Sequence, residues 1–140
     1  MASKDFVEEY AAAWSTQNVE MILSFFTEDC VYEDVALGRV NTGKQELEAF
    51  LRTTFVAIPD FHIEPKATFA AGPQAANEWV MSGTQRGSFP GIPATNKRFS
   101  VRGASIMEME EGKIRRNTDY WSLAALLQQV GVLPQTPSES

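Results

Sequence analysis

Residues 98–121 read RFSVRGASIMEMEEGKIRRNTDYW. From Arg98 to Glu110, apolar or small side chains alternate with charged and polar ones, which predicts a half-buried strand. Glu111-Gly112 predicts a turn. The strand that follows the turn ends in Asp119, flanked on its C-terminal side by two aromatic residues. Two long strands joined by a tight turn favour an antiparallel sheet, and this hairpin is the starting point for the fold.

The carboxylate of Asp119 is the first candidate for chemistry. It precedes Tyr120 and Trp121 directly. Water solvates a carboxylate well and an aromatic wall does not, so such an acid holds its proton more tightly. General acid/base catalysis needs an acid of this kind. The alternative is an exposed acid at a strand end whose aromatic neighbours only pack.

Two further strands are predicted upstream of the hairpin. Over residues 61–69, apolar and polar side chains alternate, which predicts a half-buried strand whose apolar face includes Phe69. His62 lies on the polar face, so a surface position is expected for it. Residues 75–86 form the next strand, and residues 87–93 form a loop. The face of the strand 75–86 that is expected to point inward carries Trp79, Met81 and Gln85.

The first third of the chain is predicted to be helical. Ser3 is placed to cap a helix that carries Tyr10 and Trp14 on its apolar face. A second short helix is expected over residues 19–26, and a turn over residues 27–29.

A short strand over residues 31–35 and a third helix are predicted next. The loop between Gly38 and Gly43 leads into that helix, and Thr42 with Gln45 three residues on predicts a capping box.

The chain ends with a fourth helix over residues 123–130, capped by Ser122 and closed by Gly131. Residues 135–140 are expected to be a disordered tail, which leaves residues 1–134 as a single domain. Helices followed by long antiparallel strands predict an α+β fold: a curved, mostly antiparallel sheet wrapped around the N-terminal helices as a cone with an internal pocket.

Composition excludes several classes of function. The chain has 140 residues, a net charge of −6 and a pI near 4.8, and its largest basic cluster is Arg115-Arg116. No nucleic-acid or membrane partner is therefore expected. Cys30 is the only cysteine, so a reducing, cytoplasmic location is expected. One His and one Cys cannot form a zinc site, and no metal is expected.

The order of elements resembles the cystatin-like cone of nuclear transport factor two and its enzymatic relatives. Within that superfamily the chain resembles the SnoaL-like polyketide cyclases, the ester-cyclase group. The matching segments are residues 59–61, 83–95, 102–103, 112–114, 119–121 and 126–134.

The resemblance implies a cofactor-free intramolecular aldol condensation of a hydrophobic, oxygenated, polyketide-like substrate. Asp119 falls on the position of the acid/base in that family. Ser105 and Gln85 stand where the family has histidines. Relatives of this fold form homodimers through the outer face of the sheet, where Val80 and Ile106 supply apolar area.

A second resemblance is to the first half of the ketosteroid isomerases. It rests on residues 7–10 and 31–34. In that family a helix tyrosine, here Tyr10, polarises a carbonyl, and an acid at the position of Asp34 moves the proton. An isomerase or dehydratase that uses Asp34 is therefore an alternative function, and a non-catalytic, dimeric ligand-binding module is another.

The predicted site has Asp119 and Asp34 as its catalytic residues. The residues expected to bind substrate are Tyr10, Trp14, Tyr32, Trp79, Met81, Gln85, Phe99, Ser105 and Trp121. By alternation, the arginines Arg86, Arg98 and Arg102 are expected on the outer face of the sheet.

Overall fold

The computed structural model describes residues 2–88 and 92–134, so the predicted tail lies outside the described residues. The helices are α1 (Lys4–Thr16), α2 (Val19–Leu23), α3 (Gly43–Ala57) and α4 (Leu123–Gln129). The strands are β1 (Phe26–Asp34), β2 (Arg39–Thr42), β3 (His62–Ala71), β4 (Gln74–Thr84), β5 (Arg98–Glu110) and β6 (Lys113–Trp121).

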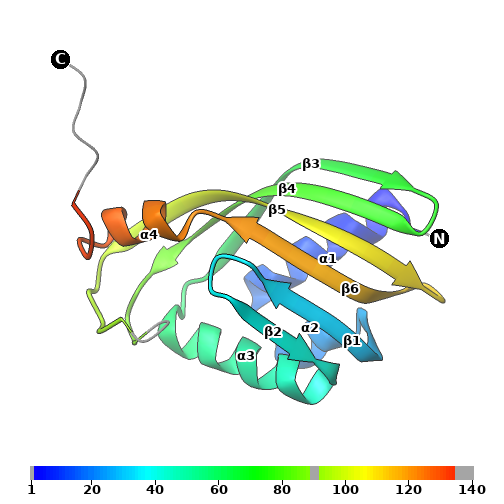
Figure 1. Ribbon diagram of the computed structural model, residues 1–140, viewed down its shortest axis with the longest axis horizontal. Coiled ribbons are helices and arrows are strands. Elements are labelled where there is room, and N and C mark those ends of the chain that lie inside the picture. The colour runs from blue at the N-terminus through cyan, green and yellow to red at the C-terminus, as the bar shows by residue number, and fades with distance from the viewer. Residues whose placement is uncertain (1, 89–91, 135–140) are drawn as a thin grey trace.

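The six strands form one curved, unclosed sheet in the order β2-β1-β6-β5-β4-β3 (Figure 1). All neighbouring strands are antiparallel except β1 and β6, which are parallel. The predicted α+β fold with a mostly antiparallel sheet is confirmed. The parallel pair matters for the site, because it makes Asp34 and Asp119 register partners on adjacent strands.

Helices α1 and α3 pack on the inner side of the sheet, and Figure 1 shows α1 passing behind the long strands while α3 runs beside β1 and β2. The α1 helix begins where the Ser3 hydroxyl accepts a hydrogen bond from the Phe6 amide at 3.1 Å, as predicted. Tyr10 and Trp14 are buried on its inner face. The α3 helix buries Leu47, Phe50 and Leu51 in the same way. Both helices therefore place apolar side chains over the sheet.

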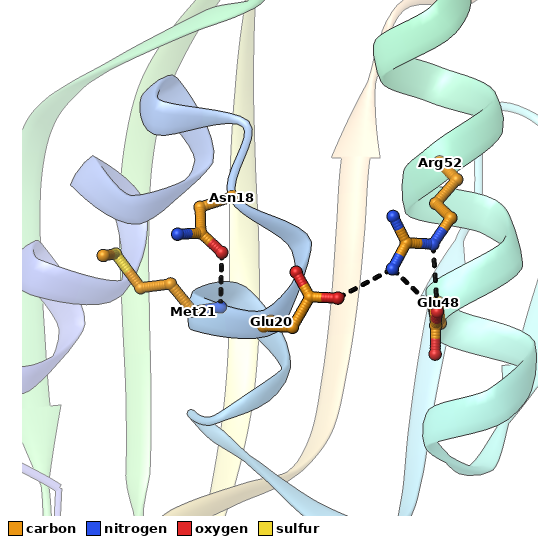
Figure 2. Close-up of polar contacts among 5 residues, drawn as sticks. All are labelled: Asn18, Glu20, Met21, Glu48 and Arg52. Carbon is orange, nitrogen blue, oxygen red and sulfur yellow. Dashed lines mark hydrogen bonds and ion pairs between the residues drawn. The ribbon is translucent and has the colours of Figure 1, made fainter.

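An exposed polar cluster links α2 to α3 (Figure 2). Asn18 caps α2, since its Oδ1 accepts a hydrogen bond from the Met21 amide at 3.0 Å. Arg52 of α3 contacts Glu20 through Nη2 at 2.8 Å and Glu48 through Nε at 2.9 Å. Exposed ion pairs of this kind contribute little to stability.

The prediction for residues 19–35 was wrong in two places. The α2 helix ends at Leu23, and Phe26 begins β1, so the expected turn over residues 27–29 belongs to a strand. Pairing between β1 and β6 is irregular between Phe26 and Val31. Exposed side chains along an irregular stretch carry no alternation, and the local sequence therefore resembled a turn.

The segment from Gly38 to Gly43 was expected to be a loop, but it contains the edge strand β2. Only Asn41 of that strand is buried, which left no apolar pattern to detect. The predicted capping box is also wrong in its partner. The Thr42 amide donates to Oε1 of Glu46 at 2.8 Å, and the Thr42 side chain makes no capping bond.

The inward face of β3 changes along the strand. Phe69, predicted to point inward, is 60% exposed, whereas Thr68 is only 9% exposed. The pairing register with β4 shifts between Pro65 and Ala67. A proline cannot donate to the ladder, and an extra residue at a bulge turns every following side chain to the other face.

Candidate active site

A cavity opens between the inner face of the sheet and helices α1 and α3. The space between its lining atoms, open mouth included, is about 630 Å³. Its apolar walls include Trp14, Phe50, Phe61, Trp79, Met81 and Trp121. Its polar side chains include Tyr10, Tyr32, Asp34, Asn77, Ser105 and Asp119. A mainly apolar concavity with a few convergent polar groups is typical of a small-molecule site.

The carboxylate of Asp119 lies at the centre of the polar group and is 7% exposed. Its Oδ1 accepts hydrogen bonds from the Ser105 hydroxyl at 2.6 Å and from Nδ2 of Asn117 at 2.8 Å. Its Oδ2 accepts a short hydrogen bond from the Tyr32 hydroxyl. All three donors are neutral groups.

The sheet register explains why these side chains meet. Ser105 of β5 is the register partner of Asp119, and Tyr32 of β1 is the partner of Asn117. Alternation along β6 places Asn117, Asp119 and Trp121 on the inner face and turns Tyr120 outward. Tyr120 is 50% exposed, so only one of the two aromatic neighbours expected beside Asp119 lines the cavity.

Burial raises the pKa of Asp119 from its ordinary value of 3.8 to about 6. The hydrogen bonds from Ser105, Tyr32 and Asn117 lower the pKa, and the negative charge of Asp34 adds a smaller increase. At pH 7 the carboxylate form exceeds the acid about tenfold, so both forms are accessible. Burial, followed by the charge of Asp119, raises the pKa of Tyr10 and of Tyr32, so both phenols stay protonated.

Asp34 is the second buried acid of the cavity and is 5% exposed. Nε1 of Trp121 donates to its two carboxylate oxygens at 3.1 and 3.0 Å, and the Leu37 amide donates to Oδ1 at 3.0 Å. Burial raises the pKa of Asp34, and the Trp121 hydrogen bond opposes that increase. Two carboxyl groups in different hydrogen-bonding environments thus share one cavity with neutral hydroxyl donors.

Seven of the nine residues predicted to bind substrate line this cavity together with both acids. Gln85 and Phe99 are not among the lining residues. Gln85 lies just beyond β4, where its Oε1 accepts from the Thr95 hydroxyl at 2.7 Å and its Nε2 donates to the Ile92 carbonyl at 3.2 Å. It holds a loop in place. Phe99 is 3% exposed and belongs to the core.

Sequence reasoning missed Asn117, which is fully buried and bonded to Asp119. Its place two residues before Asp119 was the available signal, because residues i and i+2 of a strand share a face. Within the described residues, its Oδ1 is the only buried side-chain polar atom without a hydrogen-bond partner. Leaving such an atom unpaired costs about 1–3 kcal/mol.

Other sequence predictions concern the surface. His62 is exposed, as predicted, and Arg98 and Arg102 are exposed on β5. Arg86 is also exposed, but β4 ends at Thr84, so Arg86 is not on the sheet face where it was expected. In the part of the chain that the structure describes, no group of three His, Cys, Asp or Glu side chains is placed to hold a metal ion. Over the same residues, no helix is both long and apolar enough to cross a membrane.

The model of the SnoaL-like polyketide cyclase family matches residues 4–130 of the chain. The chain therefore belongs to the SnoaL-like polyketide cyclase family. Among curated relatives, cyclase aurE of Calcarisporium arbuscula is 28% identical over 116 residues, which cover 80% of this chain and 82% of that protein. Nogalonic acid methyl ester cyclase of Streptomyces nogalater is 29% identical over 98 residues, covering 66% and 69%.

Solved structures show the same architecture. A protein of Catenulispora acidiphila with a ketosteroid isomerase-like fold, crystallised with trimethylamine, is 26% identical with a TM-score of 0.82, and the match covers 97% of this chain and all of that one. TsrD of Streptomyces laurentii is 23% identical with a TM-score of 0.83, covering 95% and 100%. The second likeness concerns the fold alone.

Proposed function

We propose that the protein is a cyclase that closes a carbon ring in a hydrophobic, oxygenated, polyketide-like substrate by an intramolecular aldol reaction, with Asp119 as acid and base. The observation that carries this proposal is the Asp119 carboxylate itself. It is buried in an apolar-walled cavity, it is held by neutral donors, and its pKa rises to about 6. A group that titrates near the working pH can take and return a proton in one catalytic cycle.

The proton balance is closed by Asp119 alone. The carboxylate removes a proton from the carbon next to a substrate carbonyl, which leaves an enolate and a neutral carboxylic acid. The enolate carbon attacks a second carbonyl of the same molecule and forms the carbon–carbon bond. The resulting alkoxide takes the proton back from Asp119, and the carboxylate is regenerated. No external oxidant, reductant or other co-reactant is needed.

Tyr32 supplies a donor at the moment when it is needed. In the resting site its hydroxyl donates to Oδ2 of Asp119. Once Asp119 is protonated on Oδ2, the new O–H can donate to the Tyr32 oxygen, and the hydroxyl hydrogen of Tyr32 is free to turn toward the enolate oxygen. The Tyr32 phenol is neutral and buried. Because water is excluded there, its hydrogen bond to the negatively charged enolate oxygen is strong.

The burial of Asp119 supports a ligand that reaches this residue with one end only. Asp119 is only 7% exposed, and the cavity walls around it are mainly apolar. A carboxylate buried this deeply can be reached by only a small part of the ligand. We expect the reacting carbons to lie at this inner end and the remaining rings to pack against Trp121 and Phe50.

Nogalonic acid methyl ester, the substrate named for the Streptomyces nogalater relative, is the first compound to test. The Asp119→Asn variant is expected to lose about 10²–10⁴-fold in kcat, because it keeps the shape of the side chain and removes its titratable proton. Asp29→Asn, on the exposed part of β1, is the matched control and is expected to keep full activity. Turnover undiminished in Asp119→Asn would contradict the assignment.

A second candidate function is an isomerase or dehydratase that uses Asp34. The observation in its favour is a second buried carboxylate in the same cavity, with a raised pKa and with Tyr10 among the lining residues. A β,γ-unsaturated ketosteroid tests it. Loss of isomerisation in Asp34→Asn with full activity in Asp119→Asn would favour the isomerase. Ligand binding can be detected by tryptophan fluorescence. Tight binding of either compound without turnover would favour a non-catalytic binding module.

We also propose that the chain forms a homodimer through the outer face of the sheet. Ile106 and Tyr120 are 49% and 50% exposed there, and Val80 is half-buried beside a shallow hollow that Arg102 also lines. Static light scattering at micromolar concentration is expected to give twice the chain mass of 15.5 kDa, and Ile106→Glu is expected to halve it. A wild-type mass near 15.5 kDa would contradict the dimer.

A cytoplasmic location is the last part of the proposal. The single cysteine, Cys30, is buried, and burial raises the pKa of its thiol, so it stays a protonated thiol. A buried thiol without a partner suits a reducing compartment. Cell fractionation tests this, and recovery in a secreted fraction would refute it.

A further inference from the structure

Trp79 lines the cavity and also belongs to a chain of hydrogen bonds that ends at Asp119. Its Nε1 donates a hydrogen bond to Oγ of Ser105 at 2.9 Å, and the Ser105 hydroxyl donates to Oδ1 of Asp119 at 2.6 Å. All three side chains are buried. An indole N–H can only donate, so the Ser105 oxygen must accept in this pair. The single hydroxyl hydrogen of Ser105 is therefore left to point at Asp119.

Gly103 makes this chain of hydrogen bonds possible. It is the register partner of Trp79 and lies two residues before Ser105 on the same face of β5. A Cβ at position 103 would lie 2.3 Å from Cη2 and 2.4 Å from Cζ3 of Trp79, distances that real Cβ atoms do not show. The six-membered ring of the indole thus occupies the space where a side chain at position 103 would begin. Any side chain at position 103 would push it away.

The two oxygens of Asp119 are consequently not equivalent. Oδ1 accepts two hydrogen bonds, from Ser105 and from Asn117, and both its lone pairs are occupied. Among the described residues, Oδ2 accepts only from Tyr32, which leaves one lone pair. We propose that Trp79, seated across Gly103, is a positioning residue that directs the Ser105 hydroxyl onto Oδ1 and so reserves Oδ2 of Asp119 for proton transfer.

The transfer step rests on the proposed cyclase function, whereas the hydrogen-bond chain can be tested without substrate. The quantity to measure is the pKa of Asp119, which is determined from the NMR signal of its ¹³C-labelled carboxyl group across a pH titration. Ser105→Ala removes a donor that lowers this pKa. The pKa is expected to rise from about 6 by about one unit, a tenfold change in proton affinity, which is the size of a hydrogen bond to a charged group.

Trp79→Phe keeps an aromatic ring and removes only the N–H. If Trp79 acts through Ser105, the pKa of Asp119 rises in this variant as well, because the hydroxyl is no longer held on Oδ1. A mere loss of wall packing would admit water and lower the pKa, since burial is the main cause of its elevation. The sign of the change therefore separates a positioning role from a packing role.

Two further variants complete this test. In the Ser105→Ala background, Trp79→Phe is expected to add no further increase, because the residue through which it acts is gone. Trp121→Phe is the matched control. Its N–H bonds Asp34, so the pKa of Asp119 is expected to change little. An unchanged or lowered pKa in Trp79→Phe, or an equal increase in both backgrounds, would overturn the proposal.

Gly103→Ala tests the seat of the indole. Alone, it is expected to displace Trp79, to raise the pKa of Asp119 and to lower the urea midpoint of unfolding. In a Trp79→Ala background, where no indole lies on the strand, the same change is expected to have almost no effect on either quantity. Equal effects in both backgrounds would mean that the glycine serves the backbone of β5, and Gly103 would then have no part in seating Trp79. A failed cyclase assay would leave all these measurements unaffected.

Discussion

Replacing Asp119 by Asn is expected to raise the free energy of unfolding at neutral pH, although it removes the residue assigned to proton transfer. Burial raises the pKa of this carboxyl from 3.8 to about 6. Each pKa unit corresponds to about 1.4 kcal/mol, so keeping the group ionised in the fold costs about 3 kcal/mol at pH 7. An Asn side chain avoids this cost, and its amide can still accept from Ser105 and Asn117 and donate to the Tyr32 oxygen.

The direction of the pH dependence follows from the raised pKa. Below pH 3.8 Asp119 is protonated in both the folded and the unfolded chain, and the acid form stabilises the fold fully. Between pH 3.8 and about 6 the unfolded chain releases the proton and the folded chain retains it. Wild-type stability relative to Asp119→Asn therefore falls across this window and is constant above it.

Urea unfolding at several pH values between about 3.5 and 7.5 measures this difference. Asp60→Asn is the control with the opposite sign. Burial acts to raise the pKa of Asp60, but two hydrogen bonds from Thr84 at 2.7 Å, one from the backbone of Asp60 itself and the charge of Arg98 together lower it. Asp60 thus stabilises the fold above its unfolded pKa, and this contribution is lost as the pH falls. A gap between Asp119→Asn and wild type that does not change with pH would refute the reasoning.

Three further predictions concern single side chains. Tyr32→Phe removes a donor that lowers the pKa of Asp119, so the acidic limb of the pH–rate profile is expected to move to higher pH. Trp121→Phe is expected to raise the pKa of Asp34, because the indole hydrogen bond opposes the effect of burial; carboxyl NMR checks this. Phe69→Ser is expected to change the free energy of unfolding by less than about 0.5 kcal/mol, whereas the fully buried Ile22→Ala is expected to lose about 2–5 kcal/mol in urea unfolding.

Local patterns predicted the fold best where alternation is regular. The strand β5 has the predicted bounds, Arg98 and Glu110, because each inward position is apolar or small and the turn residues follow directly. The same rule failed at Phe69. The bulge beside Pro65 lies in the pairing between two strands, and no window of single-strand sequence contains that information. The edge strand β2 was not predicted, because its mostly exposed side chains show no alternation of apolar and polar residues.

The candidate site was predictable as a set of residues and much less as a geometry. Asp119, Asp34 and Tyr10 were found from their positions in the pattern and from family resemblance. The expected cause of the raised pKa was a pair of adjacent aromatics, yet Tyr120 points outward. Burial in a cavity assembled from distant elements raises the pKa instead, and Tyr32 is 87 residues away along the chain. Contacts across that separation depend on strand order, which sequence periodicity does not specify.

The serine at position 105, where the resemblance implies a histidine, fits the chemistry proposed for Asp119. A protonated imidazole beside the carboxylate would lower its pKa and favour the ionised form. Among the described residues, the groups that bond the carboxylate are neutral, and the charge that acts on its pKa is the negative charge of Asp34. Desolvation therefore prevails and places the pKa at about 6. If Asp119 is the acid and base, as proposed, the pH–rate profile of the cyclase is expected to rise through about pH 6 without a second ionisation from an imidazole partner.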